Sequence, residues 1–146
     1  GKSSKVLDVV PEGVGRLTTV EEAVKFVNET GVAMLAPAVG NVHGIVKGGE
    51  PDLNIDRIKE ISDAVKVPLV LHGASGNSVA DIKAAITSGI NIIHINTELR
   101  VAFRNGLVKS LQEDPDQVAP YKYLKGARIS MQKVVEEKLK LFNNVV

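Results

Sequence analysis

The amino-acid sequence contains no cysteine and no tryptophan, and aromatic residues make up only 3% of it. Without cysteine the chain has no disulfide, no thiolate nucleophile and no cysteine–zinc site, so any metal must be held by nitrogen and oxygen ligands. The low aromatic content leaves no base-stacking platform of the kind that single-strand nucleic-acid binders use.

Two further features are missing, an excess of one charge and a long apolar run. The 18 lysine and arginine residues nearly balance 17 acidic residues, and the net charge of +1 gives no general attraction to nucleic acid or to an acidic membrane. No apolar run approaches the roughly 20 residues of a membrane-spanning helix, and the first ten residues contain no signal-peptide core. We therefore expect a cytoplasmic protein with no nucleic-acid and no membrane partner.

The composition that is present, 44% hydrophobic and 24% charged over 146 residues, is that of an ordinary globular domain. The chain begins at Gly1 within a polar segment rather than at methionine, which predicts a fragment of a longer protein. We interpret it as a single partial domain with a flexible loop at 1–17, strand–helix units at 18–113 and a C-terminal helical segment at 114–146.

Hydrophobic periodicity predicts an α/β protein with a parallel sheet. The runs VAMLAPAV, VPLVLHG and INIIHIN are typical of strands buried on both faces, although Pro37 is unfavourable inside the first. Thr18 or Thr19 caps a helix that ends at Gly31. The other expected helices lie at 55–65, within 74–89, at 97–113 and at roughly 126–141. The alternation of helices and strands favours parallel strands joined by helices.

A histidine followed by glycine occurs at two of the expected strand ends, at His43-Gly44 and His72-Gly73. The carboxyl ends of parallel strands converge on the ligand site, so both imidazoles should face one pocket. Imidazole is a good zinc ligand, and glycine lets the backbone approach a bound ligand closely. Either histidine alone is more simply explained by a hydrogen bond to a backbone carbonyl. The pair in equivalent positions favours a metal.

Polar residues also follow the second and third strands. The GASG segment at 73–76 leads into a helix and could bind an anion through backbone N–H groups, or could form only a tight turn and a cap. His94 and Asn96 share one face of the last strand, so they contact substrate or form a polar layer beneath the site. Lys47 is a flexible cation near His43 that could meet a phosphate or remain solvated.

These motifs resemble those of the class II fructose-bisphosphate and tagatose-bisphosphate aldolases. TGVAMLAPAVGNVHG, VPLVLHGASG and HINTEL are similar to the family patterns TGVDALAVAIGTAHG, IPLVLHGGSG and NVNTDL, in the same order. The similarity extends through the TELRVAF helix to the last helix, from Thr18 onward. The resemblance implies a TIM (β/α)8 barrel, of which this chain supplies about the last three βα units and the C-terminal helices.

The resemblance also implies a chemistry. The family cleaves fructose 1,6-bisphosphate to dihydroxyacetone phosphate and glyceraldehyde 3-phosphate in glycolysis and gluconeogenesis, with Zn2+ polarising the ketone and with a monovalent cation, Na+ or K+, often bound beside the phosphate. We therefore expect a homo-oligomer, a dimer or tetramer, that acts on a sugar bisphosphate. His43 and His72 correspond to two of the three zinc ligands. The expected substrate-binding residues are Gly44, Gly73, Ala74, Ser75, His94, Ile95, Asn96 and Thr97.

Some expected features of the family are missing or altered. The third zinc histidine and the proton-transfer carboxylates are expected upstream of Gly1, and Glu12, a nearby loop acid, is not assigned a catalytic role. His94 stands where the family commonly has asparagine, with milder changes at Ala74 and Glu98. The isolated chain is therefore expected to be nearly inactive.

Three alternatives remain open. The motifs do not separate fructose from tagatose stereochemistry. A non-catalytic half-barrel that binds phosphosugars is a hypothesis of a different class. A Schiff-base aldolase would need a lysine on a barrel strand, and none of the three expected strands contains one.

Overall fold

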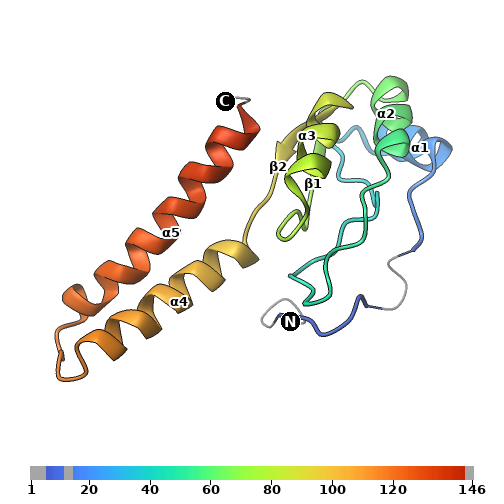
Figure 1. The fold of residues 1–146 in the computed structure, drawn as a ribbon. Helices are drawn as coiled ribbons and strands as arrows, with labels where there is room; N and C mark the ends of the chain where they lie inside the picture. Colours follow the sequence, from blue (N-terminus) through green and yellow to red (C-terminus); the bar gives the residue numbers. More distant parts are fainter. Residues whose placement is uncertain (1–5, 12–14, 144–146) are drawn as a thin grey trace. The chain divides into compact units, whose positions relative to one another are not determined.

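A computed structural model describes residues 6–11 and 15–143, so Glu12 lies outside the described residues. The chain forms two compact units, Gly1–Ile95 and Asn96–Val146 (Figure 1). Among the described residues, no helix is both long enough and apolar enough to cross a membrane. The first unit contains α1 (Val20–Thr30), α2 (Ile55–Ala64), β1 (Leu69–Leu71), α3 (Val79–Thr87) and β2 (Ile90–Ile93), and the second contains α4 (Thr97–Glu113) and α5 (Pro120–Phe142).

A short parallel pair of strands is the centre of the first unit. β1 pairs with β2 in a register that places Leu71 opposite Ile93. The predicted strand at 32–39 is wrong as a strand, because it is reduced to an isolated parallel bridge between Leu35 and Leu69. Pro37 has no N–H to donate to a ladder, which explains why pairing stops beside Leu35. The strand ends still point in one direction, as the α/β prediction requires.

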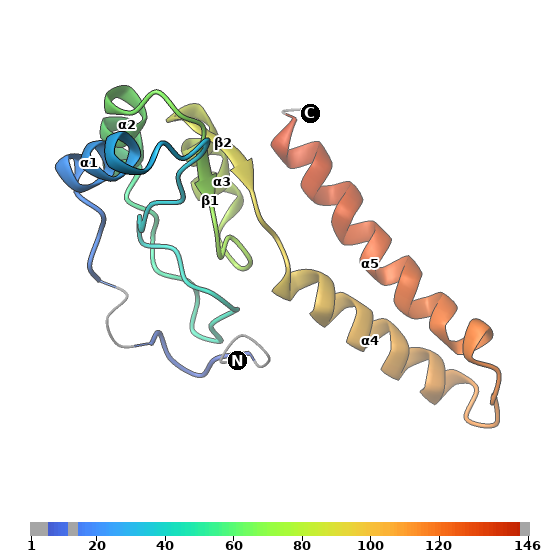
Figure 2. The same ribbon diagram turned by 180° about the vertical axis from the view of Figure 1, so that it is seen from behind.

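Local capping explains where the helices of this unit begin. Thr19 and Glu22 form a reciprocal capping box at α1, and Gly31 ends that helix with a φ of 63°, as predicted. Asn54 and Ser78 cap α2 and α3 through their side-chain oxygens. α1 lies beside α2 in both views from the side (Figure 2).

The core of the first unit is aliphatic. Ile58 and Ile61 of α2 are both 0% exposed, so this helix turns an apolar stripe toward the core. Other fully buried side chains are Leu69, Leu71, Ile82 and Val39. The core therefore includes side chains of α2, β1 and α3.

Replacing Ile61 with alanine should lower the free energy of unfolding by about 2–5 kcal/mol, because it removes a fully buried side chain and leaves a cavity. Val79→Ala is the matched control, since Val79 is 58% exposed and should change stability by less than about 0.5 kcal/mol. Urea denaturation of both variants measures the difference. Equal effects would contradict the assigned core.

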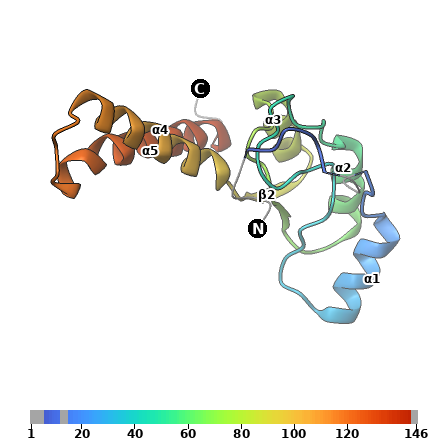
Figure 3. The same cartoon turned by 90° about the horizontal axis from the view of Figure 1, so that it is seen from below.

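The second unit is a hairpin of two helices that lie side by side (Figure 3). Gly106 of α4 packs so closely on α5 that an added Cβ would lie 2.6 Å from the carbonyl oxygen of Gly126. Glu98 and Lys138 form a half-buried ion pair of 2.8 Å between the same helices. The predicted start of the last helix, near residue 126, is wrong: α5 begins at Pro120, whose fixed φ suits the first helical position.

Candidate functional site

His72 and His94 come together because their strands are in register. Each follows the last residue of its strand, and the backbone N–H of His94 donates to the carbonyl of Leu71 at 3.0 Å. The two Nδ1 atoms are 3.4 Å apart, and the ring centroids are 4.5 Å apart with the planes nearly perpendicular. The sheet register therefore fixes which imidazoles are neighbours.

His43 reaches the same place from the preceding loop. Its ring centroid lies 5.8 Å from that of His72, and the two planes differ by 34°. His43 is exposed, whereas His72 is half-buried. The structure thus brings together the two histidines that the sequence pattern predicts to share a cation.

Asn41 joins the loop of His43 to the strand end of His72. Its Nδ2 donates to the carbonyl of His72, and its Oδ1 accepts from the backbone N–H of Val39, both at 2.9 Å. The sequence pattern did not single out Asn41, although asparagine in a glycine-rich loop is a common source of such backbone-directed bonds. Asn41 is therefore a positioning residue for the two imidazoles.

Gly73 is required where this loop crosses the strand end. Its φ is 64°, and a Cβ added there would lie 2.3 Å from the carbonyl oxygen of Val42. Because the obstacle is backbone, a side chain cannot be accommodated without moving the loop that carries His43.

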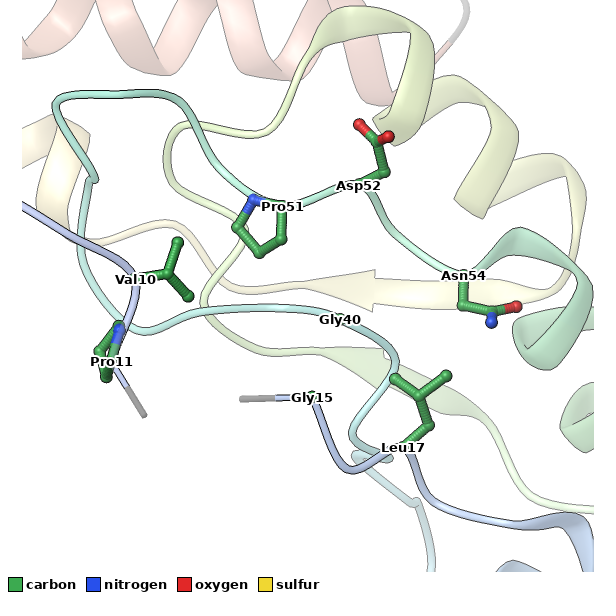
Figure 4. A pocket seen from close by; sticks show the side chains of 8 residues that line it. All are labelled: Val10, Pro11, Gly15, Leu17, Gly40, Pro51, Asp52 and Asn54. Atoms are coloured by element: carbon green, nitrogen blue, oxygen red, sulfur yellow. The ribbon is translucent and has the colours of Figure 1, made fainter. Parts of the chain in front are cut away.

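A cavity of about 460 Å³ opens beside the two histidines. It is lined by Ala36, Pro37, Ala38, Asn41, His43 and His72. A second cavity, of about 380 Å³, is lined by residues outside the predicted site (Figure 4). These are Val10, Pro11, Gly15, Leu17, Gly40, Pro51, Asp52 and Asn54. Of these two cavities, the first is the one lined by histidines.

The rings of His43 and His72 lie near the separation that a shared divalent ion requires. With a Zn–N bond of about 2.0–2.1 Å, each ring centroid lies roughly 3 Å from the metal, so two rings bound at a tetrahedral angle have centroids about 5 Å apart. The observed 5.8 Å is slightly wider, and a small rotation of the exposed His43 ring would close the difference. Within residues 6–11 and 15–143, however, no three histidine or acidic side chains are arranged as a complete metal-binding group. The described residues therefore supply part of a site.

The electrostatic setting of His72 favours the form that binds metals. Burial lowers its pKa from the ordinary value, and the neighbouring His94 and His43 imidazoles lower the pKa further. A lowered pKa keeps the imidazole neutral near pH 7, and only neutral imidazole binds a metal.

The remaining predicted substrate-binding residues lie at the ends of the same elements. Ala74 and Ser75 are buried in the loop before α3, and Gly44 is buried with a φ of 133°. The N-terminus of α3 is already capped by Ser78 and carries Asp81 in its first turn, so an anion would have to bind to the loop itself. Ile95 ends the first unit, whereas Asn96 and Thr97 begin the second. The expectation that these three residues bind substrate together therefore stays a prediction.

Lys47 and Glu50 lie in the loop after His43. Lys47 is exposed and forms a 2.7 Å ion pair with Asp8. Glu50 accepts from the backbone N–H of Val46 through Oε1 at 2.7 Å, while its Oε2 is buried and lacks a hydrogen-bond partner among the described residues. Burial raises the pKa of Glu50, and the bond from Val46 opposes this only in part.

Replacing Glu50 with glutamine should therefore stabilise the protein near pH 7, because the amide removes a poorly solvated charge and can still accept from Val46. The folded-state pKa lies above the unfolded value, so the wild type itself gains stability as the pH falls through the folded pKa. The advantage of E50Q in melting temperature should shrink from pH 7 toward pH 4. An advantage that grows on acidification would contradict this assignment.

Comparison with known proteins decides the family. The family model described as fructose-bisphosphate aldolase class-II matches residues 2–145. The chain belongs to the class II fructose-bisphosphate aldolase family. Class II aldolases are generally zinc-dependent, in agreement with the histidine pair. The family predicted from the sequence motifs is thus confirmed.

Relatives within the aldolase family carry different names. The chain is 41% identical over 135 residues to the sulfofructosephosphate aldolase of Alkalicoccus urumqiensis, covering 92% of this chain and 47% of the relative. It is 39% identical over 137 residues to the probable fructose-bisphosphate aldolase of Bacillus subtilis, with 94% and 47% covered. The chain therefore spans about half the length of the curated relatives it matches.

Solved aldolase structures agree with the fold. The YdjI aldolase of Escherichia coli K12 matches with 42% identity and a TM-score of 0.70, over 86% of this chain and 44% of that chain. A putative fructose-1,6-bisphosphate aldolase from Coccidioides immitis matches with 31% identity and a TM-score of 0.73, over 94% of this chain and 49% of that chain. The chain therefore has the structure of about half of a class II aldolase, a TIM-barrel enzyme.

Proposed function

We propose that the protein containing this chain is a metal-dependent aldolase that cleaves fructose 1,6-bisphosphate to dihydroxyacetone phosphate and glyceraldehyde 3-phosphate. The supporting observation is the placement of the His43 and His72 rings, 5.8 Å apart, beside a cavity of about 460 Å³. An imidazole at a strand end of an α/β fold, with a second imidazole beside it on a loop, stands where a substrate-polarising cation is needed.

Different residues of the site have different chemical roles. His43 and His72 hold the cation, which when bound acts as a Lewis acid toward the substrate ketone. The backbone of Gly73, Ala74 and Ser75 offers fixed donors to a phosphate. Asn41 keeps the two imidazole-bearing segments in place. The carboxylates that transfer protons are not assigned within this chain.

The choice of substrate is tested by comparing kcat/KM for three ketose phosphates in the full translated protein that contains this chain. Fructose 1,6-bisphosphate is the expected preference, and tagatose 1,6-bisphosphate tests the stereochemistry. Sulfofructose phosphate is a second candidate because of the 41% identity to an aldolase named for it. A preference of more than tenfold for either alternative would replace fructose bisphosphate as the assigned substrate.

The metal mechanism is tested against a Schiff-base mechanism in the same protein. β1 and β2 contain no lysine, so borohydride with substrate should leave no trapped adduct, whereas a chelator should abolish cleavage and added Zn2+ should restore it. A trapped adduct with full activity in chelator would overturn the proposal. Calorimetry with dihydroxyacetone phosphate tests the non-catalytic alternative: binding that ignores Zn2+ would favour a phosphosugar-binding module.

A further inference from the structure

We propose that His94 is a direct ligand of the divalent cation, in addition to His43 and His72. The inference rests on the proposed metal site and extends it to a residue for which the family resemblance predicts only a substrate contact. Its starting point is the contact between the Nδ1 atoms of His72 and His94 at 3.4 Å.

This separation matches the edge of a tetrahedral zinc site. Two nitrogens bound to one ion at about 2.0–2.1 Å with tetrahedral angles lie about 3.3–3.4 Å apart. A direct N–H hydrogen bond between the rings would be shorter, since such donors approach their acceptors to about 2.7–3.2 Å. The observed distance is therefore at the long end for a hydrogen bond and equal to the separation expected of two nitrogens that face a common cation.

The pairing of β1 with β2 places the rings of His72 and His94 next to each other. Leu71 and Ile93 are partners in the parallel register, so the residues that follow them project from the same sheet edge. The bond from the His94 N–H to the Leu71 carbonyl extends the ladder to that point. His94 is thus held beside His72 by the same sheet that positions the zinc ligand.

The exposure of His43 leaves its ring room to turn toward the other two imidazoles. His43 and His94 are both exposed, and each is near the half-buried His72. The three imidazoles do not form a complete group in the part of the chain that the structure describes. Rotation of the exposed His43 ring toward the His72–His94 pair is the movement that metal binding requires.

The test is nitrogen-15 NMR of histidine-labelled purified protein, titrated with Zn2+. The histidine signals are assigned from His43→Ala, His72→Ala and His94→Asn. We expect a metal-bound imidazole nitrogen for His94 as well as for His43 and His72. His94→Asn should weaken Zn2+ binding at least tenfold and leave one fewer imidazole in the zinc X-ray absorption spectrum. Lys83→Ala, an exposed change on α3, is the control and should alter neither measurement.

The possible outcomes separate this inference from the proposed function. Binding at His43 and His72 with His94 unaffected would overturn the inference and leave the aldolase site intact. Loss of affinity in His94→Asn with an unchanged imidazole number would make His94 a positioning residue and also overturn it. Binding at none of the three would remove the proposed metal site itself. Because the sequence has three histidines, the signal of one misfolded variant can still be assigned by elimination from the other two, and the wild-type titration then reports His94.

Discussion

Replacing His72 with alanine should abolish tight Zn2+ binding and reduce kcat/KM for aldol cleavage by about 10³-fold or more. His72 is the ring that lies near both other imidazoles, at centroid distances of 5.8 and 4.5 Å. Loss of the cation removes several kcal/mol of transition-state stabilisation, and each 1.4 kcal/mol is about tenfold in rate. Steady-state kinetics and zinc calorimetry on the full translated protein measure the two effects.

The control for His72→Ala is Lys66→Ala, an exposed change shortly before β1 that leaves the imidazoles untouched. It should retain wild-type affinity for Zn2+ and wild-type rates. The carbonyl that Asn41 binds belongs to the backbone, so His72→Ala keeps that hydrogen bond and should remain folded. A folded His72→Ala variant with full activity would contradict the assignment of this residue.

Replacing Gly73 with alanine should destabilise the protein and disturb the metal site together. The backbone there has a φ of 64°, and the new Cβ would lie 2.3 Å from the Val42 carbonyl oxygen. The left-handed conformation alone costs about 1–2 kcal/mol for a residue with a Cβ. Displacing the loop adds to this, so we expect a total of about 3 kcal/mol or more.

Gly31→Ala is a closely matched control for this effect. Gly31 has a φ of 63°, almost the same as Gly73, yet nothing lies within 4 Å of a Cβ added there. It should therefore show only the conformational cost of about 1–2 kcal/mol and leave Zn2+ affinity unchanged. Urea denaturation and zinc calorimetry of the two variants separate strain from collision. Equal losses of stability with equal zinc affinity would show that the Val42 contact is unimportant.

The sequence was sufficient for features that depend on local chemistry. Thr19 and Gly31 bound the first helix as their capping properties predict, and the helix at 97–113 agrees with α4. The two histidine–glycine motifs led to the correct family because their order and spacing are specific. They also predicted that the rings of His43 and His72 lie close together, although His43 reaches His72 from a loop and not from the end of a strand.

Features that depend on tertiary contacts were not accessible from the sequence. The apolar run at 32–39 predicts a strand, but pairing in this region is confined to the bridge at Leu35. Pro120 is compatible with a turn or with the first turn of a helix, and packing of α5 on α4 selects the helix. The role of Asn41 depends on the carbonyl of His72, 31 residues away, which no local pattern reveals.

The most direct test is a crystal structure of the purified protein grown with Zn2+, with anomalous data collected at the zinc edge. The account predicts one anomalous peak with nitrogens of both His43 and His72 at about 2.0–2.1 Å. A peak bound by only one of these imidazoles, or zinc at a different place with both rings unliganded, would contradict it.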